Sequence, residues 1–228
     1  MKNKRANKGI YKRLHELLSM LIALATHSIK ISFMVGSKAA FFSLGQSISP
    51  AIGFFGGPLA ALAVYAVRIS AQTYFSGTTL LISSFLHVPT MCAALYLSST
   101  SKCIRSLVPL LCIALFVTHP VGSQAAWYSA YWLIPIMLSF IPTNSIFLRS
   151  VGSTFVAHAV GSVMWLYTHN IDAASWHALS SVVWAERLMI ATSMTMLYYA
   201  VVSSIAFAQH LMPSLQRYTV YSTAKKAS

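Results

Sequence analysis

Long apolar segments, separated by short stretches that hold nearly all of the charge, limit how this chain can fold more than any other feature. Hydrophobic residues make up 57% of the 228 residues and charged residues only 8%, whereas a soluble domain carries roughly 25% charged residues. So few charges cannot cover the surface of a soluble domain. The sequence therefore predicts an all-α polytopic membrane protein, because a helix satisfies its own backbone hydrogen bonds in lipid.

Turn residues and charges divide the chain into eight apolar segments. They are 14–34, 39–55, 58–72, 78–98, 106–119, 126–142, 150–168 and 180–207. A full membrane crossing needs about 20 residues, so the third and fifth segments are short. Pro50 is expected to bend or break the second segment. Gly56-Gly57-Pro58 predicts a tight reversal, with the proline at the first position of the next helix.

The basic residues indicate an orientation for these segments. With the amino terminus inside and the segments alternating, twelve of the 16 Lys and Arg residues fall on the inside. This bias places both termini in the cytoplasm and requires an even number of crossings, six or eight. We expect a basic tail at 1–13, a single transmembrane helical domain at 14–207 and a second tail at 208–228, in a multi-pass protein of the cell membrane. Basic tails and short loops are typical of topology, not of nucleic-acid binding.

Motifs for metal binding or catalysis are missing from the sequence. Cys92, Cys103 and Cys112 form no CxxC pair, and no HxxxH or HExxH spacing occurs. Paired carboxylates, a GxSxG elbow and a GxxxxGK[ST] phosphate loop are also absent from the sequence. We therefore expect no metal site, no cofactor and no enzyme activity.

Glu186 and Arg187 are adjacent charges within an otherwise apolar run, in a chain whose only other acids are Glu16 and Asp172. Charged residues inside a membrane helix are costly and usually functional. The expected topology places the pair near the outer mouth of the last segment. Because consecutive residues point about 100° apart on a helix, we expect the two to face different neighbours, one of them a polar ligand group. A structural ion pair, or snorkelling to the interface, is the alternative.

Arg68 lies toward the outer end of the third segment and follows Tyr65 by three residues, so the two share a helix face. Snorkelling to the outer interface is one interpretation of this arginine. The other is a counter-charge for Glu186 or a contact with an anion.

His158 lies in the middle of the seventh segment, and Trp165 follows it seven residues later on the same face. The histidine is either a ligand donor or proton relay, or a hydrogen-bonded packing residue. Asn170, in the loop that follows, could cap a site. Four aromatic residues near the start of the sixth segment form either an interface belt or a surface that stacks on a flat ring: Trp127, Tyr128, Tyr131 and Trp132.

Three stretches resemble one family. Residues 54–63, FFGGPLAALA, resemble the FGPxAG-like turn between the second and third helices of the substrate-binding S components of energy-coupling-factor vitamin transporters. Residues 157–167 look like their fifth helix, and 184–188, WAERL, like the start of their sixth. The resemblance covers roughly 14–98 and 150–207, so it implies a six-helix bundle with an additional hairpin from 106–119 and 126–142.

The resemblance implies a subunit that captures a vitamin or related water-soluble micronutrient from outside. Such subunits pair with a transmembrane coupling subunit and two ATPases, and hydrolyse nothing themselves. The first segment offers Ser19xxxAla23 and Ser28xxxSer32 in place of the family's AxxxA docking motif. We expect the ligand near the outer halves of the third, seventh and eighth segments. The alternatives are a proton-coupled carrier acting through His158 or Glu186, a membrane enzyme and an assembly protein.

Overall fold

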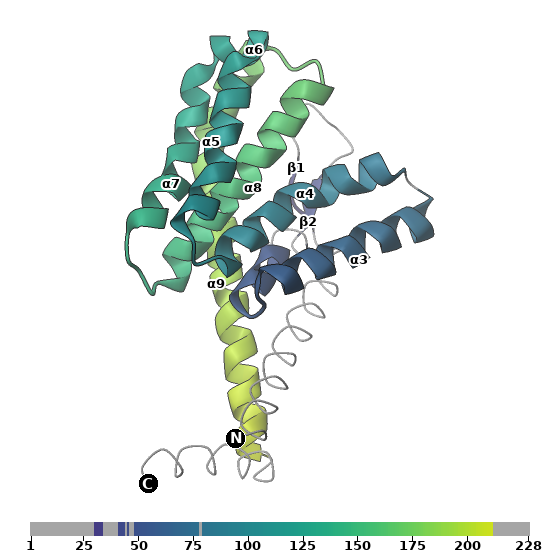
Figure 1. Cartoon of the computed structure of the whole chain (residues 1–228), viewed down its shortest axis with the longest axis vertical. Helices are drawn as coiled ribbons and strands as arrows, with labels where there is room; N and C mark the ends of the chain where they lie inside the picture. Colours follow the sequence, from purple (N-terminus) through teal and green to yellow (C-terminus); the bar gives the residue numbers. More distant parts are fainter. Residues whose placement is uncertain (1–29, 34–40, 44, 46–47, 78, 212–228) are drawn as a thin grey trace.

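The computed structural model describes residues 30–33, 41–43, 45, 48–77 and 79–211, and helices form most of this part of the chain (Figure 1). The elements in order are β1 (Lys30–Phe33), β2 (Phe41–Ser43), η1 (Ser49–Phe54), α3 (Pro58–Ser76), α4 (Leu80–Ser98), α5 (Lys102–Thr118), α6 (Pro120–Gln124), η2 (Ala126–Trp132), α7 (Leu133–Phe140), α8 (Ile146–Thr168) and α9 (Ala173–Leu211). Apart from the two short antiparallel strands, in which Lys30 pairs with Ser43, the all-α class is confirmed. Both predicted terminal tails lie outside this part of the chain, except for residues 208–211.

Two of the described helices are long and apolar enough to cross a membrane, α8 over 146–168 and α9 over 173–208. Both fit a membrane location. The prediction of six or eight full crossings is not matched by the described helices. The sixth apolar segment, 126–142, divides into the 3-10 turns of η2 and the eight-residue α7, and eight helical residues reach only about 12 Å.

The second apolar segment, 39–55, is likewise not a single helix. It contains the strand β2 and the 3-10 helix η1, with Pro50 in the first turn of η1. Proline has no N–H to donate to a preceding helical turn, so it is well suited to the first turn of this helix. The predicted break at Pro50 and the helix start at Pro58, with Gly57 as its N-cap, are both confirmed.

Helix α8 packs against α4, α5, α7 and α9 (Figure 1). One close approach depends on glycine, because a Cβ at Gly152 would overlap the Tyr96 ring and hydroxyl. The Tyr96 hydroxyl instead passes α8 and donates to the Pro135 carbonyl of α7 at 3.0 Å. The buried Ser153 hydroxyl donates to the Ala93 carbonyl of α4 at 3.0 Å. Small residues on α8 therefore let its neighbours approach and hydrogen-bond across it.

Helix α9 runs back along α8 in the opposite direction. Thr195 Oγ1 of α9 lies 3.4 Å from Ser150 Oγ of α8 and fixes the register between the two helices. With 39 residues, α9 is about 58 Å long, so it continues past the start of α8 and projects from the other helices (Figure 1).

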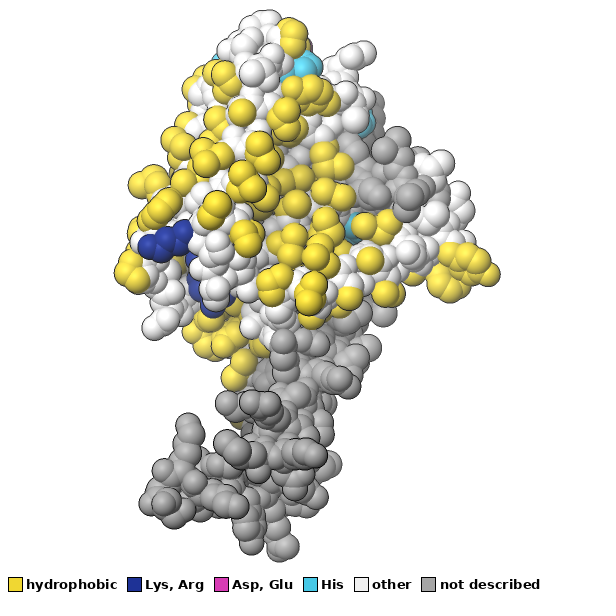
Figure 2. Space-filling model, viewed as in Figure 1, with side chains coloured by type: hydrophobic (Ala, Val, Ile, Leu, Met, Phe, Trp, Pro, Cys, Tyr) yellow, Lys and Arg dark blue, Asp and Glu magenta, His cyan; other side chains and the backbone are white. Residues whose placement is uncertain are grey.

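Large apolar side chains are exposed while several polar ones are buried. Helix α5 exposes Ile104, Leu107, Leu110, Leu111 and Leu115, and apolar side chains cover much of the face seen in Figure 2. The buried polar residues of α8 and α9 include Ser150, Ser153, Thr154, Ser162 and Arg187. An apolar exterior of this extent is typical of a surface that another apolar phase covers.

Candidate functional site

His158, in the middle of α8, is held by hydrogen bonds at both ring nitrogens. The indole Nε1–H of Trp132 donates to His158 Nδ1 at 3.1 Å. The hydroxyl of Tyr128 lies 2.8 Å from His158 Nε2. Both partners come from η2, whose 3-10 turns place Tyr128 and Trp132 on the side that faces α8. The expectation of a hydrogen-bonded histidine is therefore met by residues 26 and 30 positions away.

These two bonds determine the protonation state of the imidazole. An indole N–H can only donate, so Nδ1 must offer its lone pair, and the neutral ring carries its proton on Nε2. His158 Nε2–H then donates to the Tyr128 oxygen, which leaves the Tyr128 hydroxyl proton free to donate elsewhere. Trp132, His158 and Tyr128 thus form a connected polar chain inside the helical bundle.

Glu186 and Arg187 form an ion pair on α9, with Arg187 Nη2 3.1 Å from Glu186 Oε2. The Arg187 side chain is 7% exposed and that of Glu186 20%. The expectation that adjacent residues face different neighbours was wrong, because both side chains are long enough to turn toward each other. The Arg187 Nε is buried and has no hydrogen-bond partner among the described residues.

The register of α8 and α9 brings the ion pair to the level of the histidine. His158 lies eight residues after Ser150 on α8, and Arg187 lies eight residues before Thr195 on α9. In antiparallel helices these equal steps return the two side chains to the same height. In agreement, the charge of Arg187 acts on both His158 and Tyr128. We call Tyr128, Trp132, His158, Glu186 and Arg187 the central polar cluster.

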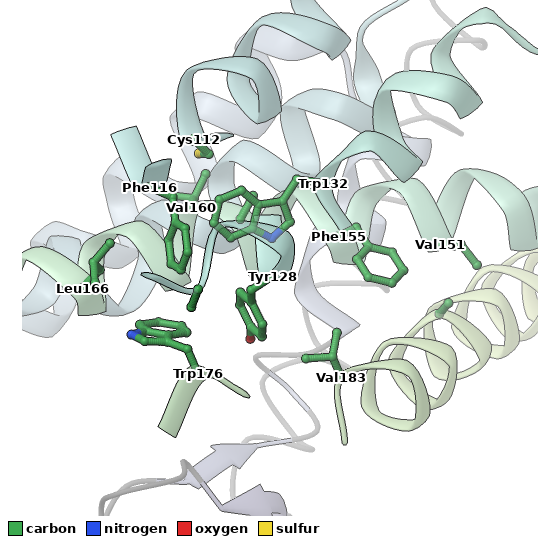
Figure 3. Packing of buried hydrophobic residues seen from close by; sticks show 13 residues of the cluster. Cys112, Phe116, Tyr128, Trp132, Val151, Phe155, Val160, Leu166, Trp176 and Val183 are labelled. Carbon is green, nitrogen blue, oxygen red and sulfur yellow. The ribbon is translucent and has the colours of Figure 1, made fainter. Parts of the chain in front are cut away.

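Aromatic rings pack around Tyr128 and Trp132 of the central polar cluster (Figure 3). On one side Phe116 stacks on Tyr128 at 5.8 Å and meets Trp132 edge-on at 5.1 Å. On the other, Tyr131 and Phe155 meet Trp184 edge-on at 5.7 and 5.5 Å between ring centroids. Tyr128 and Trp132 are fully buried among these rings, and edge-to-face and stacked contacts of this kind hold the rings in place.

Trp176, at the start of α9, adds a second unpaired donor. It is 2% exposed and packs edge-on against Phe116 at 5.2 Å and against Tyr128 at 5.2 Å. Its indole Nε1–H is buried with no hydrogen-bond partner in the described part of the chain. A buried indole N–H usually finds a partner. The region therefore has two unused donors, the Arg187 Nε–H and this one.

Arg68 does not belong to the central polar cluster. Its guanidinium lies 5.6 Å from the ring of Tyr65, which confirms that the two share a face of α3. The counter-charge of Glu186 is Arg187, not Arg68. The Tyr65 hydroxyl lies 2.9 Å from Ser49 Oγ of η1, so this part of α3 is tied to η1.

Trp165 and Asn170 also lie away from the central polar cluster. Trp165 is about 10 Å further along α8 than His158, is half-buried and stacks on His169 with ring centroids 3.7 Å apart. Asn170 is exposed in the loop between α8 and α9. In the same loop Asp172 caps α9 by accepting a hydrogen bond from the Ser175 N–H at 2.8 Å. Hydrogen bonds from the Ser175 side chain and backbone hold the pKa of Asp172 below its usual value.

The sequence places the four aromatic residues of η2 together but does not separate their roles. The structure exposes Trp127, whose indole donates to His177 Nδ1 at 2.8 Å. It buries Tyr128 and Trp132 at 1% and 0% exposure, so an interface belt does not describe these two. The sequence holds both donors, but only the packing of η2 against α8 brings them to His158.

Comparison with known proteins gave no match to a protein family, to a curated protein or to a solved structure. Within the described residues, no group of three or more His, Cys, Asp or Glu residues could hold a metal ion.

Proposed function

We propose that this chain is a membrane protein that captures a small water-soluble micronutrient, and that the ligand binds at the central polar cluster. The observation that carries the proposal is the buried guanidinium of Arg187, which has an unpaired Nε and lies beside a half-buried carboxylate and a hydrogen-bonded histidine. Arg187 and Glu186 would contact the charged or polar groups of the ligand, and His158 would present a donor and acceptor of fixed direction.

The unfilled hydrogen-bonding capacity of Arg187 favours a ligand over a purely structural ion pair. A guanidinium carries five N–H donors, and Arg187 Nη2 donates to Glu186 Oε2 at 3.1 Å. Leaving a buried donor unpaired costs about 1–3 kcal/mol, and more for a charged group. A carboxylate or carbonyl oxygen of a bound molecule would accept from this side chain and offset that cost.

The neighbouring aromatic rings favour a ligand with a flat ring. Trp184, two residues before Glu186 on α9, meets Tyr131 and Phe155 edge-on, while the rings of Tyr131 and Phe155 stack on each other at 26°. Such rings offer both faces and edges to a heterocycle, and a hydrogen-bond acceptor on the same molecule would reach Arg187. Water-soluble vitamins combine these two features, which agrees with the S-component resemblance of 184–188.

Transport is the role that best fits a ligand site between two apolar helices. The site lies between α8 and α9, the two helices long and apolar enough to cross a membrane. The sequence contains no phosphate-binding loop, so ATP-driven uptake would require a transmembrane coupling subunit and ATPase partners. The proposal includes a multi-pass protein of the cell membrane, with both termini cytoplasmic.

The hydrogen bonds of His158 weigh against a proton-coupled carrier. To accept a second proton, the imidazole would have to take it on Nδ1 and give up the bond from Trp132. Glu186, the other candidate for proton coupling, is held by Arg187. Both groups are therefore better suited to binding a ligand than to cycling protons.

Ligand binding by the purified full-length chain tests the proposal. Mass spectrometry of the protein identifies molecules that co-purify, and titration with thiamine, biotin, riboflavin and a queuosine precursor measures affinity. Arg187→Gln should weaken binding at least tenfold, the effect of losing a hydrogen bond to a charged group. Arg68→Gln, which alters an arginine resting on Tyr65, should change affinity less than about twofold.

Two results would contradict the proposal. The absence of any bound small molecule from the folded wild-type chain would favour an assembly protein. Uptake by proteoliposomes that contain this chain alone, and that collapses with the proton gradient, would favour the carrier.

A further inference from the structure

A second group of basic residues lies where α5 and α8 begin, at the end of α8 opposite Asp172. Arg105 is in the first turn of α5 and Arg149 in the first turn of α8. The two guanidinium groups are close enough for their charges to interact. Lys102 lies on the same turn as Arg105, with its Nζ 5.6 Å from the Phe140 ring. We call Arg105 and Arg149 the arginine pair.

Aromatic rings hold each member of the arginine pair in place. The Arg105 guanidinium lies 4.3 Å from the centroid of the Tyr96 ring, and its buried Nε has no hydrogen-bond partner in the described structure. The Arg149 guanidinium lies 5.0 Å from the Phe54 ring, and its Nη2 donates to the Leu97 carbonyl at 2.7 Å. Both side chains are half-buried. The two guanidinium groups are therefore held in place, yet most of their N–H donors remain available to a ligand.

Nothing acidic among the described residues balances the arginine pair. The two described acids are Asp172, beyond the far end of α8, and Glu186, which pairs with Arg187; Glu16 lies outside this part of the chain. Neither α5 nor α8 has an acidic residue in its first turn. Helix amino termini carry partial positive charge, so cations there are unfavourable and an anion is favoured. Two guanidinium groups and two helix ends thus add up to one uncompensated positive site.

We propose that the arginine pair binds the phosphate group of an anionic phospholipid. Guanidinium donors match phosphate oxygens in a bidentate geometry. The flanking residues Ile104, Phe147 and Leu148 are large, apolar and exposed, and would lie against acyl chains. On the face seen in Figure 2, the basic side chains gather in one region among apolar ones, and no acidic side chain is visible there. The site needs only a membrane around the chain and is independent of solute capture.

Lipid retention by the full-length chain tests this site. The protein is purified in a neutral detergent with equal amounts of phosphatidylglycerol and phosphatidylcholine, and native mass spectrometry counts each bound lipid. Wild type should retain phosphatidylglycerol in preference. Arg105→Gln and Arg149→Gln should each weaken its retention about fivefold, the effect of one basic residue at a lipid surface. Arg68→Gln, an arginine on α3 that also rests on an aromatic ring, should retain it as wild type does.

Charge-conserving variants separate lipid binding from folding. Arg105→Lys and Arg149→Lys keep the cation and should lose less than half as much lipid as the glutamine variants. If the glutamine variants fail to fold, salt dependence replaces them, because raising the salt should release phosphatidylglycerol from wild type.

Equal retention by wild type and the double glutamine variant would overturn the proposal. So would complete displacement of the lipid by millimolar inorganic phosphate, which would assign the site to a free anion. Loss of solute binding with lipid retention unchanged, as expected for Arg187→Gln, would separate the two sites.

Discussion

The central polar cluster and the arginine pair differ in whether a nearby acid compensates their positive charge. Arg187 has a carboxylate at 3.1 Å and a histidine whose nitrogens are both hydrogen-bonded. Arg105 and Arg149 have aromatic rings and one carbonyl, but no acid among the described residues. The first region has a counter-charge within the protein but keeps two unpaired donors, and the second has no counter-charge among the described residues. In a chain with three acids, this difference separates a site suited to a ligand with hydrogen-bond acceptors from a site suited to an anion.

Of the substitutions that test this difference, Glu186→Gln should destabilise the chain most. It removes the counter-charge of Arg187 and leaves a guanidinium that is 7% exposed as an uncompensated cation. Losing one partner of a buried ion pair costs about 3 kcal/mol. Arg187→Gln should cost less, because Glu186 is 20% exposed and can reach a more polar environment. Thermal unfolding in detergent measures both. Equal destabilisation by Arg68→Gln would show that any arginine loss, and not burial of the charge, sets the effect.

Trp132→Phe should destabilise the chain by about 2 kcal/mol, because His158 Nδ1 loses its donor within an apolar surrounding. A double-mutant cycle with His158→Ala should give a coupling energy of about 1 kcal/mol. Trp184→Phe is the matched control, since its ring is 45% exposed. A coupling energy near zero would mean that Trp132 acts through packing alone, and the central polar cluster would lose its hydrogen-bonded histidine.

Arg105→Gln should have a small effect of the opposite sign in a neutral detergent. It removes one of two neighbouring cations at helix amino termini, and the helix dipole alone makes such a change worth about 0.5 kcal/mol of stability. The thermal midpoint should therefore rise slightly without lipid and fall relative to wild type when phosphatidylglycerol is added. A loss of stability in both conditions would show that the contact of Arg105 with the Tyr96 ring outweighs the repulsion between the two cations.

Apolar runs and proline positions predicted much of this helical arrangement. The segments 58–72, 78–98 and 150–168 correspond closely to α3, α4 and α8, and Pro58 begins α3 as expected. The prediction of one span over 126–142 was wrong, because hydrophobicity alone does not distinguish η2 followed by α7 from one helix. The crossing count depended on that distinction.

The candidate site was only partly predictable. Glu186, Arg187 and His158 stood out because charged or titratable groups are rare in apolar helices. These residues lie close together because of the register that Ser150 and Thr195 set between α8 and α9, and a local sequence pattern does not predict that register. Trp165 lies about two turns beyond His158 on α8, and Asn170 lies in the loop that follows, so closeness in sequence does not bring them to the cluster. The arginine pair joins residues 44 positions apart, and the sequence shows its members only as basic residues on the predicted inside.

Replacing Asp172 should have the smallest effect. This residue shows how a helix start with an acidic cap differs from the starts of α5 and α8. At α9 an acid caps the amino terminus and accepts from Ser175, whereas α5 and α8 begin with cations. Its pKa is lowered in the folded chain, so its contribution to stability is full above the unfolded pKa, about 3.9. That contribution to stability is lost as the pH falls through the pKa of Asp172 in the folded chain.

Asp172→Asn keeps the cap but not the charge. Its thermal midpoint should lie slightly below that of wild type near neutral pH and converge with it in acid. A gap that persists in acid would mean that capping geometry, and not charge, distinguishes this helix start from those of α5 and α8.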